Sequence, residues 1–352
     1  MTKALIVCAN TLSNGVGSVE ECLHLEQQLC ELGEAPIELT IDPLSTDWHS
    51  EQQVGRFRTG CGPIEALARA KTLIENGCNA VVISGEDLLK SQYSPEQRLS
   101  LMAIYGEDYP LTAAYTELAE HFIERHNSTP TEFKHIAQAL FDNYLRSYQA
   151  ALGEAFHADQ LPDAKWYNFL NPLFRGVDCA NPLVDFTGRL LICSEHMPAK
   201  LHRPRQTCSE LRGVGIARAN GDGRDYIGDI SAYQHLKQAF EKCCDSSGVD
   251  INRQLKAQQL LLEAYTCCPV VPMAFLLHIG AVASLQAIPE FLETQPITVT
   301  GGMNLARAAW NCTALNGLIA MHQCLINGDK NYGLVHGNGG LGYRQGLALL
   351  SK

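Results

Sequence analysis

Short apolar runs alternate with amphipathic stretches from the first residues of the chain to Gly85. Three runs are apolar and β-rich: residues 3–10, 37–42 and 79–85. Two stretches between them carry apolar side chains at helical spacing: residues 18–33 and 63–77. Each stretch ends on a glycine, Gly33 or Gly77, which is typical of a helix C-terminus. Strands that alternate with helices predict a parallel sheet with helices packed on it.

The pattern changes over residues 86–185, where helical stretches dominate and strand signals are scarce. The two longest helical stretches cover residues 110–127 and 129–152. The second begins with Thr129 followed by a proline, which is a typical helix start. We therefore predict a helical insertion over about 86–185, after which an apolar run at 189–194 returns to the sheet.

The alternation returns in the last third of the chain. Residues 249–271 predict a helix that leads into a turn. A strand at 297–305, a helix at 309–328 and a strand at 331–340 follow. Residues 213–229 are rich in glycine but lack the strand and helix that flank a dinucleotide-binding loop, so they predict a surface loop.

Two parts of the chain share the order helix, Asn-Gly pair, strand. The Asn-Gly pairs begin at Asn76 and Asn327, and each separates a helical stretch from an apolar run. A repeat of this length is too long for a solenoid and predicts an internal duplication. We expect an N-terminal half over 1–195, which includes the helical insertion, and a C-terminal half over 196–352.

Composition and charge narrow the function classes. The 352 residues carry a formal net charge of −11, and the basic residues are scattered, which argues against a nucleic-acid surface. No run of 18 apolar residues is present, so no membrane span is expected, and the first residues predict a strand rather than a signal peptide. The 14 cysteines predict free thiols in the cytoplasm. None of them forms C-x-x-C, so no metal site is expected.

Cys61 is the first candidate for chemistry. It lies just before Pro63, which suits the first position of a helix. Unpaired backbone N–H groups and the helix dipole at such a position would lower the pKa of the thiol. The alternative is that Cys61 is a small buried residue, which is the commoner role of a cysteine in a chain with so many of them.

The chain resembles the thiolase superfamily, in particular the thiolase-like acetyl-CoA acetyltransferase homologues. The resemblance rests on segments that follow the family order from about Leu5 to Leu349. They are GCGPIEALARAKTLIENGCNAVVISGED (60–87), the helical stretch at 110–140, AYTCCPVV (264–271), TVTGGMNLARAAWNCTALNGLIAM (298–321) and GLVHGNGG (333–340).

The resemblance implies an α/β fold of five layers, αβαβα, built from two duplicated βαβαβαββ halves with a helical loop insertion. It also implies a tight homodimer or a heteromer with a thiolase-type subunit. The family chemistry uses a coenzyme A thioester as substrate and needs no further cofactor. One cysteine takes the acyl group, a histidine activates it, a second cysteine moves protons, and a His or Asn holds the enolate oxygen.

All four of these groups are replaced in this chain. The family register puts the nucleophile at Gly60, one residue before Cys61, and the activating histidine at Ala308. It puts the oxyanion-binding residue at Tyr265 and the second cysteine at His336.

The candidate catalytic residues are therefore His336 as a general base, Tyr265 as a donor to an oxyanion, and Cys61 if the register is displaced by one residue. The candidate substrate-binding residues lie in the glycine-rich loops and beside them: Gly301, Gly302, Asn311, Gly337, Gly339 and Gly340. Glycine there would let backbone N–H groups approach a thioester oxygen, and turn geometry is the alternative reason for it. Cys267 and Cys312 also fall in family active-site segments, with apolar packing as their default role.

Two functions remain open. The first is a divergent acyl-CoA acyltransferase that uses His336 with a relocated thiol or without a covalent step. The second is a non-catalytic subunit that binds an acyl-CoA or supports an active thiolase-type partner. Loss of a nucleophile together with its base favours the second, because such a loss usually removes several orders of magnitude of rate.

Overall fold

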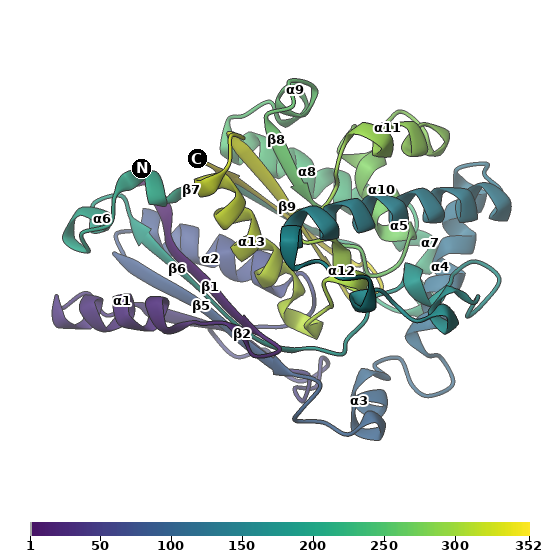
Figure 1. Ribbon diagram of the computed structural model, residues 1–352, viewed down its shortest axis with the longest axis horizontal. Coiled ribbons are helices and arrows are strands. Elements are labelled where there is room, and N and C mark those ends of the chain that lie inside the picture. Colours follow the sequence, from purple (N-terminus) through teal and green to yellow (C-terminus); the bar gives the residue numbers. More distant parts are fainter. Residues whose placement is uncertain (1) are drawn as a thin grey trace.

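Ten strands form one mixed sheet in the computed structural model, which describes residues 2–352 (Figure 1). The strands are β1 Ala4–Ser13, β2 Val16–Gly17, β3 Ile37–Ile41, β4 Arg56–Phe57, β5 Ala80–Leu88, β6 Asp185–Ser194, β7 Ser209–Arg218, β8 Leu260–Glu263, β9 Tyr332–Gly339 and β10 Arg344–Ser351. Their order is β4-β3-β5-β6-β1-β7-β10-β9-β8, with β2 paired only to β1.

Thirteen α-helices accompany the sheet in the described part of the chain. They are α1 Glu20–Glu31, α2 Gly62–Glu75, α3 Pro95–Met102, α4 Leu111–Arg125, α5 Pro130–Leu152, α6 Met197–Lys200, α7 Ile227–Ile230, α8 Gln234–Ser247, α9 Ile251–Lys256, α10 Val270–His278, α11 Ile288–Thr294, α12 Gly302–Leu305 and α13 Thr313–Asn327. Short 3-10 turns connect several of them, among them Gly176–Asp178 and Trp310–Cys312.

The strand directions repeat on the two sides of the sheet. In the first part β3 and β5 are parallel, and β6 is antiparallel to both β5 and β1. In the second part β8 and β9 are parallel, and β10 is antiparallel to both β9 and β7. The two parts join where β1 pairs with β7, at Leu5 opposite Glu210 and Ile6 opposite Ser209. The α/β class that the sequence predicts is confirmed. The prediction of a parallel sheet is wrong for the centre of the sheet, because β6, β1, β7 and β10 pair antiparallel with their neighbours.

Helices α2 and α13 lie between the two parts of the sheet (Figure 1). They contact each other, and each contacts strands of both parts. Helix α1 packs on β1 and β6, and α8 packs on β7 and β10. The apolar side chains of α2 and α13, such as Leu67 and Leu318, share one core with side chains of β1, β6, β9 and β10. This central pair of helices therefore places the N-terminus of α2 against the ends of strands from both parts.

The segment between β5 and β6 is helical, as the sequence predicts. It contains α3, α4 and α5, and α5 starts with a capping box in which Thr129 accepts from the Glu132 backbone N–H and Glu132 accepts from the Thr129 backbone N–H. Helix α4 contacts α7 and α10, and α5 contacts α11 and α12. The segment therefore packs against helices of the last third of the chain.

The prediction of a surface loop over residues 213–229 is wrong for its first part. Residues 209–218 form β7, a central strand between β1 and β10. Glycine is needed there because α8 lies very close to the strand: a Cβ on Gly213 would lie 2.7 Å from the Cys243 carbonyl oxygen, and one on Gly215 would overlap the Ala239 carbonyl oxygen. These glycines serve close packing of helix on strand rather than a flexible loop.

Two predictions in the last third are also wrong. Residues 249–271 form a short helix, the strand β8 and the start of α10 instead of one helix, because residues 260–263 pair with β9. No strand forms over 297–305. The Glu263 carboxylate accepts hydrogen bonds from the backbone N–H groups of Val299 and Thr300, so these groups are satisfied without a strand partner.

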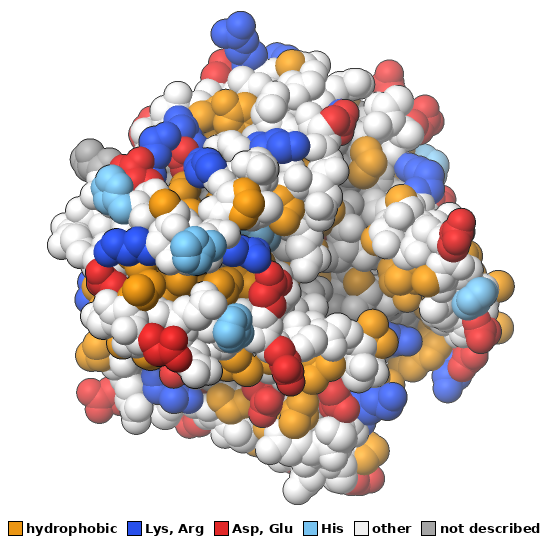
Figure 2. Space-filling model, turned by 60° about the vertical axis from the view of Figure 1, so that its left-hand side comes forward, with side chains coloured by type: hydrophobic (Ala, Val, Ile, Leu, Met, Phe, Trp, Pro, Cys, Tyr) orange, Lys and Arg blue, Asp and Glu red, His pale blue; other side chains and the backbone are white. Residues whose placement is uncertain are grey.

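Figure 2 shows acidic and basic side chains interspersed over the face that it displays. Among the residues that the structure describes, no helix is both long enough and apolar enough to cross a membrane.

The central layer gives a test of the fold. Leu67 on α2 is fully buried in the core between the two parts of the sheet, whereas Leu99 on α3 is 75% exposed. We expect Leu67→Ala to lower the free energy of unfolding by about 2–5 kcal/mol, because it removes buried methylene groups and leaves a cavity. The matched variant Leu99→Ala should change it by less than about 0.5 kcal/mol. Urea unfolding followed by circular dichroism measures both, and equal effects would contradict the described core.

Candidate functional site

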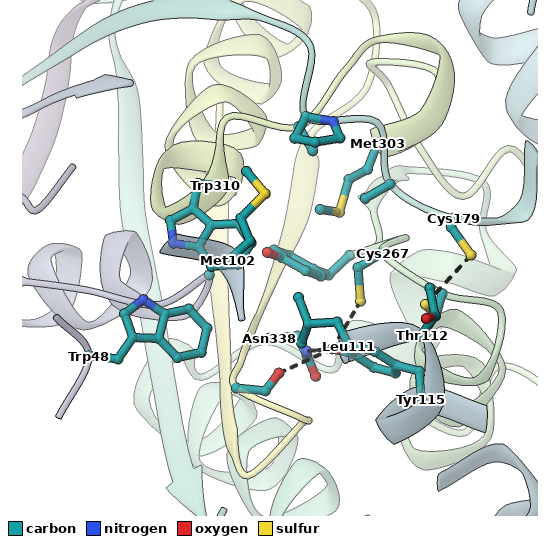
Figure 3. Close-up of a pocket in the computed structure, with 17 residues that line it drawn as sticks. Trp48, Met102, Leu111, Thr112, Tyr115, Cys179, Cys267, Met303, Trp310 and Asn338 are labelled. Atoms are coloured by element: carbon teal, nitrogen blue, oxygen red, sulfur yellow. Dashed lines mark hydrogen bonds between the residues drawn. The ribbon is translucent and has the colours of Figure 1, made fainter. Parts of the chain in front are cut away.

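A cavity of about 250 Å³ lies where the two parts of the sheet meet the helical segment (Figure 3). Its walls come from Gly60 in the segment before α2, the segments at the ends of β8 and β9, helices α3 and α4, and α12 with the loops around it. Three of the four positions singled out by the family register line it: Gly60, Tyr265 and Ala308. Among its described lining residues there is no Asp, Glu, Lys, Arg or His. The cavity therefore suits an uncharged, largely apolar group.

Tyr265 leaves no room for a side chain at position 60. A Cβ on Gly60 would overlap the hydroxyl oxygen of Tyr265 and the backbone carbonyl oxygen of Asn338. The Tyr265 ring thus occupies the space where a side chain at position 60 would begin. A cysteine at position 60 would fit only if both Tyr265 and the Asn338 backbone moved.

Tyr265 presents a neutral hydroxyl to the cavity. The side chain is 8% exposed, and burial raises the pKa of its phenol well above the ordinary value, helped by the neighbouring Cys267. A phenol that stays protonated is a hydrogen-bond donor. The role of donor to an oxyanion that the sequence suggests for Tyr265 stays a prediction.

The structure places Cys61 away from the cavity. The side chain is fully buried, and its Sγ lies 2.8 Å from the position that a Cβ on Gly346 of β10 would take. Cys61 does precede the first residue of α2, as the sequence predicts. Burial nevertheless raises the pKa of the Cys61 thiol well above the ordinary value, and Glu65 adds to the rise. The expected lowering by the helix N-terminus is wrong, because the loss of solvation outweighs the helix dipole.

His336 lies behind the wall of the cavity and not among the residues that line it. It is 1% exposed, and its ring stacks on Phe275 with centroids 4.8 Å apart. Both ring nitrogens are engaged: Nδ1 accepts from the Tyr265 backbone N–H at 3.4 Å, and Nε2 lies 2.7 Å from Gln345 Oε1. Burial lowers the pKa of His336 to about 4, so the ring is neutral near pH 7.

A chain of hydrogen bonds connects His336 to the cavity. Gln345 donates from Nε2 to Asn338 Oδ1 at 2.7 Å, and Asn338 donates from Nδ2 to the Tyr115 hydroxyl at 3.4 Å. Tyr115 in turn donates to the Gly340 carbonyl oxygen at 3.1 Å. Asn338, Tyr115 and Gly340 all line the cavity. His336 therefore orients the Asn338 amide through Gln345 and does not itself face the cavity.

Of the five candidate glycines, Gly340 alone is among the described lining residues of the cavity. Gly337 and Gly339 lie against the segment before α2. A Cβ on Gly337 would lie 3.1 Å from the Gly60 carbonyl oxygen, and a Cβ on Gly339 would overlap the Thr59 hydroxyl. Gly301 and Gly302 have φ of 97° and 79°, and α5 leaves no room for a Cβ at Gly301. These four glycines allow close backbone packing around the site.

Asn311 positions two residues of the site from outside the cavity. Its Oδ1 accepts from the Trp48 indole at 3.2 Å and from the Thr59 backbone N–H at 2.9 Å. Its Nδ2 donates to the Asp42 carbonyl oxygen at 2.8 Å. Trp48 lines the cavity next to Trp310, with ring centroids 5.4 Å apart, and Thr59 directly precedes Gly60. Asn311 thus fixes the position of Trp48 and Thr59 and is not itself among the residues that line the cavity.

Several lining residues are not among the residues singled out from the sequence: Trp48, Met102, Leu111, Tyr115, Cys179, Met303, Trp310 and Asn338. Asn338 stands within the glycine-rich segment at 333–340, so the spacing of that segment could have indicated it. Tyr115 and Met102 come from the helical insertion, whose contact with the sheet no local pattern reveals. Among the described residues, no group of three or more His, Cys, Asp or Glu side chains could hold a metal ion.

The chain has a thiolase-like α/β fold, as its similarity to two solved structures shows. It is similar to a monomeric SCP2-thiolase like protein type 1 (STLP1) from Mycobacterium smegmatis, with a TM-score of 0.73 and 15% identity, over 99% of this chain and 77% of the other. It is also similar to the Ltp2-ChsH2(DUF35) aldolase, with a TM-score of 0.65 and 14% identity, over 99% of this chain and 98% of the other. No family model and no curated protein sequence matches the chain.

The overlap at Gly60 predicts a coupling that can be measured. We expect Gly60→Ala to lower the free energy of unfolding by about 1–3 kcal/mol, because the new methyl group collides with Tyr265 and Asn338. The cost should be smaller in a Tyr265→Ala background, where the colliding ring is gone. Gly228→Ala is the matched control, since its Cβ would meet nothing within 4 Å. A double-mutant cycle by urea unfolding that shows no coupling would contradict the placement of Tyr265.

Proposed function

We propose that this chain is a divergent thiolase-like acyl-CoA acyltransferase homologue that binds the acyl group of a coenzyme A thioester in the cavity. The observation that supports the proposal is the overlap at Gly60, where the Tyr265 ring fills the space that a side chain would need. Gly60, Tyr265 and Ala308, which the resemblance aligns with usual catalytic positions of the family, line one apolar cavity. An acyl-enzyme at position 60 is therefore excluded while Tyr265 keeps this position. The chemistry left to the cavity uses its neutral donors and its thiols.

Each candidate residue has a role in this proposal. Tyr265 donates its hydroxyl to the thioester oxygen, and Asn338 supplies a second N–H donor from the same wall. His336 acts through Gln345 on Asn338 and is a positioning residue. Cys61 packs against β10. Two duplicated halves, 1–195 and 196–352, are consistent with the repeated strand directions on the two sides of the sheet.

A non-catalytic subunit remains the alternative, and the loss of all four usual groups favours it. The cavity would then bind an acyl-CoA without turnover, or the fold would only support a partner. The Ltp2-ChsH2(DUF35) aldolase shares the fold, so the fold itself does not choose between acyl transfer and carbon–carbon bond cleavage.

Assembly is a separate part of the proposal. We expect a homodimer, or a heteromer with a thiolase-type subunit, as the resemblance implies. Multi-angle light scattering of the purified chain at micromolar concentration should give twice the mass of one chain. A single-chain mass, both alone and mixed with a thiolase-type subunit from the same source, would refute this part of the proposal.

Ligand binding tests the proposed site directly. We expect coenzyme A or acetyl-CoA at millimolar concentration to raise the melting temperature, because a ligand that binds only the folded state stabilises it. Ala308→Leu, which places a larger side chain in the cavity wall, should abolish the shift caused by acetyl-CoA.

The control for this experiment is Ala158→Leu, which enlarges an exposed residue in a 3-10 turn of the helical insertion and should keep the shift. Differential scanning fluorimetry measures all three proteins. If neither ligand shifts the wild-type melting temperature, only the scaffold function remains.

A further inference from the structure

Cys267 is the thiol that the cavity offers to a ligand. It lies between β8 and α10, and its side chain points into the space beside Tyr115 (Figure 3). Cys268 and Cys179 also line the cavity, with their Sγ atoms 3.9 Å apart, but Cys268 is only 6% exposed. Cys267 is half-buried and is one of the residues that line the cavity. Cys61, by contrast, is fully buried outside the cavity.

The surroundings of Cys267 stabilise a thiolate. The Cys267 thiol lies 3.3 Å from the Tyr115 hydroxyl, and the segment leads directly into the N-terminus of α10. Burial acts to raise the pKa of the Cys267 thiol. Hydrogen bonds with Cys268 and Tyr115 and from the backbone N–H groups of residues 267 and 268 outweigh it, so that the pKa is lowered. In the thiol form the Cys267 S–H donates to the Tyr115 oxygen, whose own proton is donated to the Gly340 carbonyl oxygen. The pKa of Cys268 is raised well above the ordinary value by the thiols beside it and by burial.

Donors for a developing oxyanion stand on the same walls. Tyr265 carries its hydroxyl into the cavity two residues before Cys267. The Asn338 amide is held by Gln345 and lies 3.4 Å from the Tyr115 hydroxyl that contacts Cys267. A nucleophile and two neutral donors around one apolar space are the parts that attack on a thioester carbonyl requires.

We propose that Cys267 is the acyl-accepting nucleophile of this chain and that it forms an S-acyl intermediate with a short acyl thioester bound in the cavity. The proposal rests on the proposed function, which places such a thioester there. The Cys267 thiol first releases its proton to water. The thiolate attacks the carbonyl carbon, a new carbon–sulfur bond forms, and the bond to the coenzyme A sulfur breaks. The leaving sulfur takes the electron pair and then a proton from water.

The experiment uses the full chain with acetyl-CoA and, separately, with the acetyl thioester of N-acetylcysteamine. Intact-mass measurement and peptide mapping after mild acid quench locate any acetyl group, and neutral hydroxylamine should remove it if it is a thioester. We expect one acetyl group on Cys267 in the wild type. Cys267→Ser and Cys267→Ala should lose this label while they keep the melting-temperature shift with coenzyme A.

Cys78→Ser is the matched control, because Cys78 lies outside the cavity and its thiol only donates to the Ala80 carbonyl oxygen. It should keep the full label. An acetyl group on Cys61 or on Cys268 instead of Cys267 would overturn the assignment.

The outcomes also separate the inference from the proposed function. A melting-temperature shift with acetyl-CoA and no label from either thioester overturns the nucleophile and leaves the binding site. A label on Cys267 from the small thioester without any shift by coenzyme A supports the nucleophile and overturns the coenzyme A site. Absence of both effects overturns both.

Discussion

The contact between Tyr265 and the backbone at Gly60 is the constraint on which the rest of the site depends. The ring fills the space that a side chain at position 60 would need, and glycine is the residue that leaves this space free. A side chain at position 60 and the Tyr265 ring in its present place are therefore mutually exclusive. The same contact forms part of the wall of a cavity that Ala308 also lines, and no charged residue is among the described lining of this cavity.

Two cysteines that come before helices differ in their surroundings. Cys61 directly precedes α2, whereas Cys267 lies three residues before the first residue of α10. Cys61 is fully buried against β10 and its pKa is raised, whereas Cys267 meets several hydrogen-bond donors at the edge of a cavity and its pKa is lowered. A position directly before a helix therefore does not lower the pKa of a thiol when burial removes its solvation.

The spacing of apolar residues and the capping residues predict those helices and strands that depend on contacts between near neighbours in the sequence. The long amphipathic helices, the Thr129 start of α5 and the Asn-Gly ends of α2 and α13 were all predictable from spacing and capping. Strands β7 and β8 were not, because the glycines of β7 serve a close helix and β8 depends on pairing with β9. The alignment with the family indicated from the sequence that Gly60, Tyr265 and Ala308 belong to one site. Tyr115 and Trp48 also line the cavity, but only the tertiary packing places them there.

The neutral hydrogen-bond chain from His336 to Tyr115 explains how the cavity keeps its polar groups oriented without charge. His336 holds its ring between the Tyr265 backbone and Gln345, and burial keeps the ring neutral near pH 7. Gln345 then fixes the Asn338 amide, whose Nδ2 donates to Tyr115. Polar groups whose hydrogen bonds are made in this way lose little free energy when they are buried. An unpaired charge buried at the same place would cost on the order of several kcal/mol.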